Sequence, residues 1–274
     1  MHDRATEIMI VTILDKKLRK SRKIFLDVGG FEGESSRAAL DPRFGFDAVF
    51  TFEPVQSCAN NIENTVRDRR LTVLRFGLYD QTASLPLGDA GELGGSVYTQ
   101  DNNGQLCTFV KASDWFADNI AEIDQVWLKL NCEGAELNIL NDLLDSGEAS
   151  KVREALIDLD AAKFPSLHAS AEALLIRLKT APFSFHYPPE VQYGAVTNYG
   201  GIRQWLVMTG AATKSRFASA IYNLPLAMDR RFNGYHKIRL LRLLRLRPEP
   251  RLISPSQRAT WSPIYEQRGP LNFD

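Results

Sequence analysis

The sequence lacks the features of several large classes of protein. None of its apolar runs reaches the roughly 18 to 20 residues that cross a bilayer. Its 274 residues include only three cysteines, Cys58, Cys107 and Cys132. An odd number of widely spaced cysteines argues against a disulfide framework and a zinc site, and for a reducing compartment. We therefore expect a cytoplasmic protein without a metal site.

Two common phosphate-binding motifs are also absent. The dinucleotide fingerprint needs glycine at its first, third and sixth positions, but counting from Gly29 those positions hold Gly29, Phe31 and Glu34. No phosphate loop ending in Gly-Lys-Ser or Gly-Lys-Thr occurs in the chain. These absences disfavour an oxidoreductase that uses a nicotinamide cofactor.

The stretch around which the chain is organised is KIFLDVGGFEG, residues 23–33. Its apolar first half is followed by Asp27 and then by Gly29, Gly30 and Gly33, which predicts a buried parallel strand that stops in a tight turn. Residues 33–40 are predicted to form a helix. A strand, a glycine turn and a helix open a nucleotide-binding α/β unit, because glycines let backbone approach a ligand and the helix N-terminus offers free N–H groups.

Strands and helices are predicted to alternate along most of the remaining chain. The alternation indicates an α/β fold with a doubly wound, mostly parallel, seven-stranded sheet. The last two strands are expected to form an antiparallel pair. A small β excursion is predicted at residues 81–112, over the active face. The seven predicted strands are residues 24–26, 48–54, 71–76, 126–130, 155–160, 183–187 and 205–208, and the helices between them are residues 56–69, 114–121, 132–144 and 169–179.

The chain divides into an acidic body and a basic tail. Residues 212–274 contain 12 Lys and Arg but only 4 Asp and Glu, whereas the remainder contains 21 and 29. We predict an N-terminal helical segment at residues 1–22, an α/β domain at 23–210 and a basic C-terminal extension at 211–274. The charge difference suggests that the body and the tail do different things.

Residues 235–247, YHKIRLLRLLRLR, interleave leucine and arginine at helical spacing. Such a segment can pack on the domain or on a second subunit, lie on an anionic membrane surface, or bind nucleic acid. Nucleic acid is the least favoured partner, because the interleaved aromatics of a single-strand binder are missing. Peripheral contact with the inner membrane and self-association therefore both remain open.

Three polar clusters follow predicted strands, at residues 27–33, at Glu53 and at residues 131–136. A doubly wound sheet brings such strand ends together beside its ligand. Glu53 lies 20 residues beyond Gly33, where an acid can accept hydrogen bonds from both ribose hydroxyls. Asp27 would repel a pyrophosphate but tolerates a sulfonium and an amino group, so a phosphate-free nucleoside such as S-adenosylmethionine fits.

At these positions the sequence resembles the FkbM-type methyltransferases, a family of class I, Rossmann-like enzymes that use S-adenosylmethionine. The similar stretches are DVGGFEG at 27–33, FEP at 52–54, GLYD at 77–80 and KLNCEGAE at 129–136. The resemblance covers roughly residues 23–208, and the Lys-x-x-x-Glu-Gly-Ala-Glu run is its most specific part. Many members of the family methylate hydroxyl groups of sugars, polyketides and related glycan or natural-product substrates.

The resemblance implies a set of cofactor contacts. Asp27, Gly29 and Gly33 would hold the methionine end, Glu53 the ribose, and residues 77–80 would lie near the adenine. The full set of candidate cofactor-binding residues is Asp27, Gly29, Gly30, Gly33, Glu53, Pro54, Gly77, Leu78, Asp80 and Asn131. The family usually has Asp at Asn131 and Glu at Asp158. Because Asn can act neither as a base nor as an anionic metal ligand, no metal site is assigned.

Methyl transfer from a sulfonium to an alcohol requires an aligned acceptor oxygen and a group that removes its proton. The candidate catalytic residues are Glu133 first, then Asp160, and also Glu136, with His168 and His186 as weaker candidates. Glu136 could equally be a first-turn acid that complements a helix dipole, and Asp80 could equally be a turn former.

Two functions are therefore expected from the sequence. The first is O-methylation of a hydroxyl on a sugar, glycan or natural product. The alternative is a catalytically silent relative that binds the cofactor or scaffolds a glycan-biosynthesis complex through its basic tail.

Overall fold

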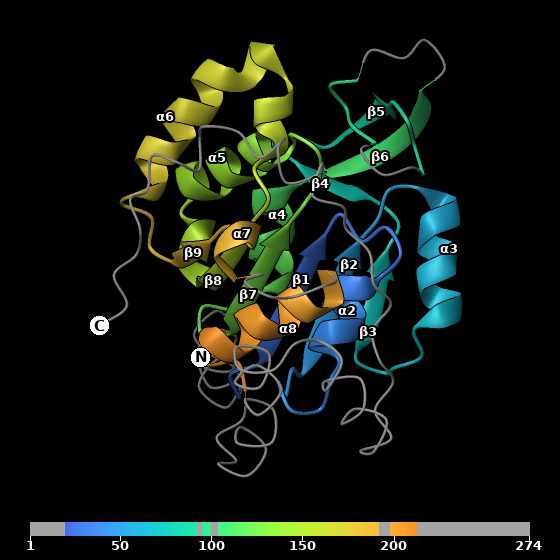
Figure 1. Ribbon diagram of the computed structural model, residues 1–274, viewed down its shortest axis with the longest axis vertical. Helices are drawn as coiled ribbons and strands as arrows, with labels where there is room; N and C mark the ends of the chain where they lie inside the picture. The colour runs from blue at the N-terminus through green and yellow to red at the C-terminus, as the bar shows by residue number, and fades with distance from the viewer. Residues whose placement is uncertain (1–19, 92–94, 100–103, 192–197, 213–274) are drawn as a thin grey trace, which may run out of the picture.

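A six-stranded parallel sheet forms the centre of the protein in the computed structural model (Figure 1). Its strand order is β3-β2-β1-β7-β8-β9, and every neighbouring pair is parallel. The inner strands read as continuous apolar runs because helices cover both of their faces. The six strands are β1 (Lys23–Val28), β2 (Ala48–Phe52), β3 (Leu71–Leu74), β7 (Gln125–Leu130), β8 (Val152–Ile157) and β9 (Ser184–His186).

The structure describes residues 20–91, 95–99, 104–191 and 198–212. All but residues 20–22 of the predicted N-terminal helical segment lie outside these ranges. So do nearly all of the predicted basic extension and the whole of the leucine- and arginine-rich segment at 235–247. Within the described residues, no helix is both long enough and apolar enough to cross a bilayer.

Helices pack on both faces of the sheet, as expected for a doubly wound, Rossmann-like α/β fold. Along β1 the side chains alternate, so that Ile24 and Leu26 join the core on one face while Phe25 joins the core on the other. The first face is covered by α4 (Ala112–Asn119), α5 (Glu136–Ser146) and α6 (His168–Leu178). The second is covered by α2 (Glu34–Ala39) and α8 (Asn198–Met208), which lie side by side in Figure 1, with α7 (Pro188–Val191) next to them. The remaining helix, α3 (Gln56–Thr65), lies along the β3 edge of the sheet.

The predicted small β excursion is confirmed. Strands β4 (Gly77–Tyr79), β6 (Gln105–Lys111) and β5 (Ala83–Leu87) form a separate sheet in that order, with β4 and β6 parallel and β5 and β6 antiparallel. A bridge between Gly88 and Ser96 extends it. The Ser96 hydroxyl donates to the Glu133 carbonyl over 2.5 Å, so this small sheet is attached to the loop that follows β7.

The predicted antiparallel closing pair is wrong. β9 pairs with β8 in parallel, and residues 205–208, which were expected to form a strand, belong to α8. Ile202, Trp205 and Leu206 are the buried side chains of α8, at the i, i+3, i+4 spacing of a helix. The apolar run at 205–208 is too short to show this helical spacing, which is visible only when Ile202 is included. The central sheet of the described residues therefore has six strands rather than seven.

The fifth strand begins and ends three residues earlier than expected. It ends at Ile157, and residues 160–163 form the 3₁₀ segment η2 (Asp160–Lys163). Asp158 and Asp160 therefore lie beyond the strand end, in the turn that leads to α6. Two further 3₁₀ segments, η1 (Glu148–Lys151) and η3 (Pro165–Leu167), precede β8 and α6.

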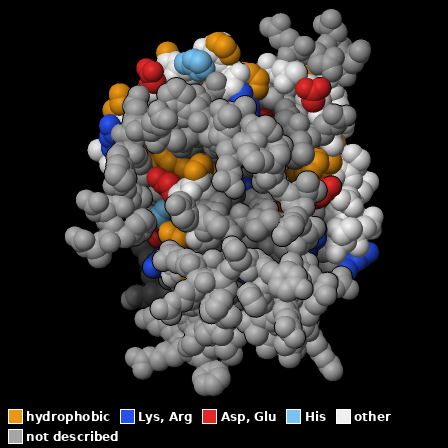
Figure 2. All heavy atoms as spheres, in the orientation of Figure 1, with side chains coloured by type: hydrophobic (Ala, Val, Ile, Leu, Met, Phe, Trp, Pro, Cys, Tyr) orange, Lys and Arg blue, Asp and Glu red, His pale blue; other side chains and the backbone are white. Residues whose placement is uncertain are grey.

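On the face of the molecule shown in Figure 2, the hydrophobic and charged side chains of the described residues are interspersed.

Candidate functional site

The strand order reverses between β1 and β7, which are neighbours at the centre of the sheet. Ligands of doubly wound proteins bind at such a point, outside the carboxyl ends of the strands. The loops after these strands, residues 29–33 and 131–135, are in contact, because a Cβ atom on Gly29 would lie 1.8 Å from the Asn131 carbonyl oxygen. Gly29 also has a φ of +82°, which glycine adopts without strain. Glycine at this position is thus required for the two loops to meet.

The other two glycines of the first loop also lie against the protein's own chain. A Cβ on Gly30 would be 2.3 Å from Cγ2 of Thr51 on β2. A Cβ on Gly33 would be 3.1 Å from Cγ2 of Ile62 on α3. These glycines let the loop lie close to β2 and α3.

Asp27 is fully buried, and protein groups surround its carboxylate. Its Oδ2 accepts hydrogen bonds from the Ser36 backbone N–H at 3.0 Å and the Ser36 hydroxyl at 2.7 Å. Its Oδ1 lies 3.0 Å from Nζ of Lys129, which also donates to the Gly29 carbonyl at 2.7 Å. Asp27 therefore joins β1, α2 and β7 beneath the loop.

Lys129 is a site residue that the sequence reasoning missed. It begins the KLNCEGAE run, and it is the register partner of Asp27 across the β1–β7 pair. The signal that could have found it is a lysine inside an apolar strand, since a buried lysine needs an anionic partner.

Glu53 holds the first loop in its conformation. Its Oε2 accepts from the Phe31 backbone N–H at 2.7 Å, and its Oε1 accepts from the Val55 backbone N–H at 2.9 Å. Burial raises the pKa of this carboxyl group. Phe31 has a φ of 45°, which is unusual for a residue with a side chain and often marks a functional loop. Pro54, between Glu53 and Val55, is half-buried.

The second loop is held in a similar way by Glu136, the first residue of α5. Glu136 is fully buried, and its two oxygens accept from the backbone N–H groups of Cys132 at 2.6 Å and Gly134 at 2.8 Å. Burial raises its pKa to about 7. The Asn131 side chain is half-buried, and its backbone N–H donates to the Val28 carbonyl at 3.1 Å.

Two of the three predicted catalytic acids meet at one cation. Nζ of Lys163 lies 2.6 Å from Oε2 of Glu133 and 3.1 Å from Oδ1 of Asp160. Burial, together with the neighbouring carboxylates, raises the pKa of Asp160 to about 8. Burial also raises the pKa of Asp158 to about 6, and its buried Oδ1 forms no hydrogen bond with the described part of the chain. Glu133, Asp158, Asp160 and Lys163 are referred to below as the acid cluster.

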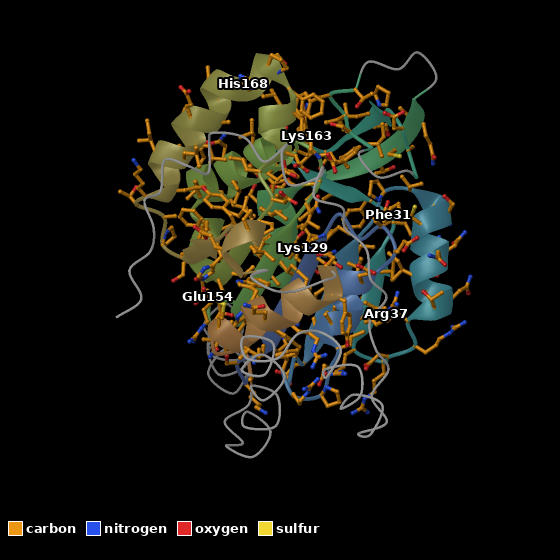
Figure 3. All side chains as sticks on the ribbon, viewed as in Figure 1. Phe31, Arg37, Lys129, Glu154, Lys163 and His168 are labelled. Atoms are coloured by element: carbon orange, nitrogen blue, oxygen red, sulfur yellow. The ribbon has the colours of Figure 1, made fainter. Side chains whose placement is uncertain are left out.

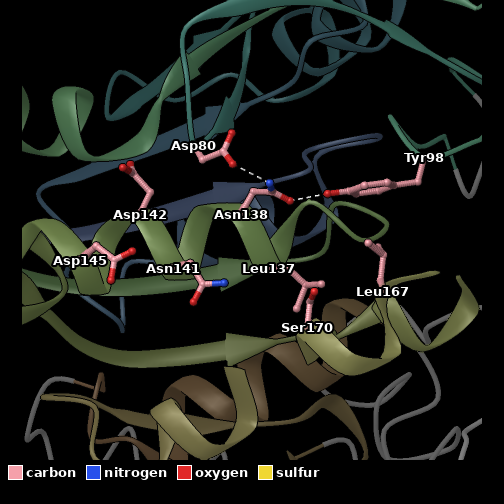
Figure 4. Close-up of a pocket in the computed structure, with 9 residues that line it drawn as sticks. All are labelled: Asp80, Tyr98, Leu137, Asn138, Asn141, Asp142, Asp145, Leu167 and Ser170. Atoms are coloured by element: carbon pink, nitrogen blue, oxygen red, sulfur yellow. Dashed lines mark hydrogen bonds between the residues drawn. The ribbon is translucent and has the colours of Figure 1, made fainter. Parts of the chain in front are cut away.

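The residues that were expected to lie near the adenine, 77–80, are in or next to the small sheet. Gly77 and Leu78 are buried in β4, where a Cβ on Gly77 would lie 2.5 Å from the Phe109 ring. Asp80 accepts from Nδ2 of Asn138 on α5 at 2.7 Å. Figure 4 shows this bond at one side of an open cavity of about 400 Å³ along α5. The cavity is lined by Asp80, Tyr98, Leu137, Asn138, Asn141, Asp142, Asp145, Leu167 and Ser170.

The two histidines lie at other positions. His168 is exposed at the start of α6, and Nε2 of His186 on β9 lies 3.5 Å from Oε2 of Glu154. In the described ranges, no group of three or more His, Cys, Asp or Glu side chains is arranged to hold a metal ion.

Comparisons of the chain with protein-family models, with curated proteins and with solved structures found no match. The chemistry of the site therefore has to be judged from its own groups. Six carboxyl groups follow or end the four inner strands, and within the described residues two ammonium groups, those of Lys129 and Lys163, contact them. Such an excess of carboxyl groups suits a cationic ligand, which favours their ionised form, and opposes a polyphosphate. The six carboxyl groups are those of Asp27, Glu53, Glu133, Glu136, Asp158 and Asp160.

Proposed function

We propose that this protein is an S-adenosylmethionine-dependent methyltransferase of the class I, FkbM-like type, which methylates a hydroxyl group of a sugar, glycan or natural product. The observation that carries the proposal is the carboxyl-rich sheet edge at the reversal of strand order between β1 and β7. A nucleoside with a sulfonium and no phosphate matches that charge. A dinucleotide does not.

The residues present fit such a cofactor. The loops at 29–33 and 131–135 would border it, with Glu53 at the ribose. Each Glu53 oxygen accepts one backbone N–H and keeps acceptor capacity for a hydroxyl. When bound, S-adenosylmethionine supplies an electrophilic methyl group.

Asp160 is the best-placed proton acceptor among the three candidate acids. Glu136 is fully buried, with both oxygens bound to backbone N–H groups. Asp160 lies at the strand end, and its pKa of about 8 suits proton removal near neutral pH. Glu133 lies close to Asp160, because both carboxyl groups contact Nζ of Lys163.

Calorimetric titration with S-adenosylmethionine, S-adenosylhomocysteine, ATP and NAD tests the proposal. We expect binding of the first two ligands and none of ATP or NAD. Glu53→Gln should weaken binding at least tenfold, while Glu63→Gln, which changes a half-buried acid on α3 that pairs with Arg75, should leave it unchanged. Absence of S-adenosylmethionine binding would defeat the proposal.

A second candidate, a catalytically silent relative, is favoured by one observation. The carboxylates of Asp27, Glu53 and Glu136 are each engaged by the protein's own donors. Turnover assays on a panel of sugar and polyketide alcohols separate the candidates. Cofactor binding without methylation of any acceptor supports the silent relative, and methylation that is lost in Asp160→Asn supports the enzyme.

We further propose a cytoplasmic location in which residues 235–247 contact an anionic surface, such as that of the inner membrane. Sedimentation of the full chain with anionic vesicles tests this location. Replacing Arg239, Arg242 and Arg245 with Gln should release the protein from the vesicles. Equal binding by both proteins would contradict membrane contact through this segment.

A further inference from the structure

The ammonium groups of Lys129 and Lys163, the two lysines labelled in Figure 3, are held in different ways, although both contact carboxyl groups. Lys129 has a side chain only 6% exposed, and it is bound to Asp27 and to the Gly29 carbonyl. Lys163 has a side chain 55% exposed, and the contacts of its ammonium group are to Glu133 and Asp160. Lys129 is thus a fixed part of the core, whereas the Lys163 side chain borders solvent, into which it can move.

The anionic partners of Lys163 are held firmly. Glu133 has a φ of 51°, a left-handed conformation that persists only where surrounding contacts enforce it. The Ser96 hydroxyl donates to the Glu133 carbonyl. The Glu136 carboxylate accepts from the N–H groups of Cys132 and Gly134, the residues on either side of Glu133. The backbone that carries the Glu133 carboxylate is therefore fixed, and the lysine on its flexible stem is the more movable half of the pair.

The acid cluster also has more negative than positive charge. It contains three carboxyl groups and one ammonium group, and the buried Oδ1 of Asp158 has no hydrogen-bond donor among the described residues. An incoming cation would meet acceptors that are already in position.

We propose that Lys163 is an internal counter-ion that occupies the cation subsite of this protein and swings out when a cationic ligand enters. The inference rests on the proposed function, under which that ligand is S-adenosylmethionine. Lys163 then lowers the apparent affinity for the cofactor, because each binding event must first displace it. Displacement of Lys163 also leaves the carboxyl groups of the acid cluster free to bind a sulfonium in preference to a neutral thioether.

Acetylation of lysines, read by mass spectrometry with and without saturating S-adenosylmethionine, tests the displacement directly. A lysine released from two carboxylates becomes more reactive, so acetylation of Lys163 should accelerate at least threefold. Lys111, which lies 3.7 Å from Asp142 and outside the acid cluster, is the matched control and should not change. Unchanged or slower acetylation of Lys163, at a cofactor concentration that calorimetry shows to be saturating, would overturn the inference alone.

The variant Lys163→Gln provides a second test by calorimetry. We expect it to bind S-adenosylmethionine about tenfold more tightly than the wild type, a change of about 1.4 kcal/mol, and to gain less for S-adenosylhomocysteine. Lys111→Gln should change neither affinity. Equal or weaker binding by Lys163→Gln would show that the lysine does not compete with the ligand. Failure of both the wild type and the variant to bind would overturn the proposed function together with this inference.

Discussion

Two regions of this molecule affect its stability in opposite ways. On the face covered by α2 and α8, Phe25, Phe46, Trp127 and Trp205 pack edge to face or tilted, with ring centroids 5.5 to 6.2 Å apart. At the carboxyl ends of the strands, buried acids and the left-handed residues Phe31 and Glu133 gather instead. Buried charge and backbone strain cost stability, so their concentration at one edge indicates a region shaped for binding. The packing of these four aromatic residues stabilises the fold and offsets the cost of the buried acids at the strand ends.

Trp205→Ala should produce the largest loss of stability. Trp205 is fully buried in α8 against Phe25, so its truncation leaves a large cavity. We expect the free energy of unfolding to fall by about 3 to 5 kcal/mol, measured by urea denaturation. Trp205→Phe should cost clearly less. A loss below about 1 kcal/mol for the alanine variant would mean that α8 does not pack as described.

Asp27→Asn should be the most damaging single change at the acidic edge. It leaves the buried ammonium of Lys129 without its carboxylate, at an expected cost of about 3 kcal/mol. Asp68→Asn, in the more exposed pair with Arg70, should cost less than about 1 kcal/mol. Denaturation curves for the two variants measure the difference, and similar costs would contradict a buried, structural role for Asp27.

A pair of glycine substitutions separates loop contact from backbone strain. Gly29 and Gly147 have φ values of +82° and +85°, but only Gly29 has atoms of other residues where a Cβ would lie. Gly147→Ala should cost about 1 kcal/mol from strain alone. Gly29→Ala should cost about 2 kcal/mol or more, because the added Cβ meets the Asn131 carbonyl. Thermal melts of both proteins measure the effect, and equal costs would show that the two loops can separate freely.

The last predicted effect depends on pH. Burial raises the pKa of Asp158 from 3.8 to about 6, so the folded protein binds this proton more tightly than the unfolded chain. This group therefore lowers stability as pH rises from about 4 to about 6, and its full cost is present above that range. Asp158→Asn should be more stable than the wild type by up to about 3 kcal/mol at pH 8, because each pKa unit corresponds to about 1.4 kcal/mol, and equally stable near pH 4.

Urea denaturation across this pH range measures the Asp158 effect. Asp118→Asn, at an exposed position on α4, is the matched control and should follow the wild type at every pH. A stabilising effect of Asp158→Asn that persists unchanged at pH 4 would contradict a pKa raised by burial.

The sequence predicted the elements that depend on short-range pattern. The apolar runs of the inner strands, the glycine turn at residues 29–33 and the short strands of the small β excursion are each visible within about ten residues. It failed for α8, because an apolar run at 205–208 matches a strand unless Ile202 is counted with it. It also placed Asp158 and Asp160 in a strand that ends earlier, at Ile157.

The partners of the charged residues could not be predicted, because they depend on which distant segments meet. Asp27 and Lys129 are about a hundred residues apart in sequence and become neighbours through the β1–β7 register. Glu133 and Lys163 meet because the turns after β7 and β8 lie side by side. For the same reason, the bond from the Phe31 N–H in the loop after β1 to Glu53 after β2 could not be predicted. Glu136 instead accepts from Cys132 and Gly134 of its own loop, a contact that no spacing rule specifies.

By itself, the amino-acid sequence determined an α/β chain with acids and glycines at its strand ends, since apolar periodicity and turn residues act locally. Only the tertiary structure decided that one lysine of the candidate site is buried and fixed while the other is exposed and movable. The physical reason is that burial, and pairs such as Asp27–Lys129 and Glu133–Lys163, depend on segments far apart in sequence that the sheet brings together.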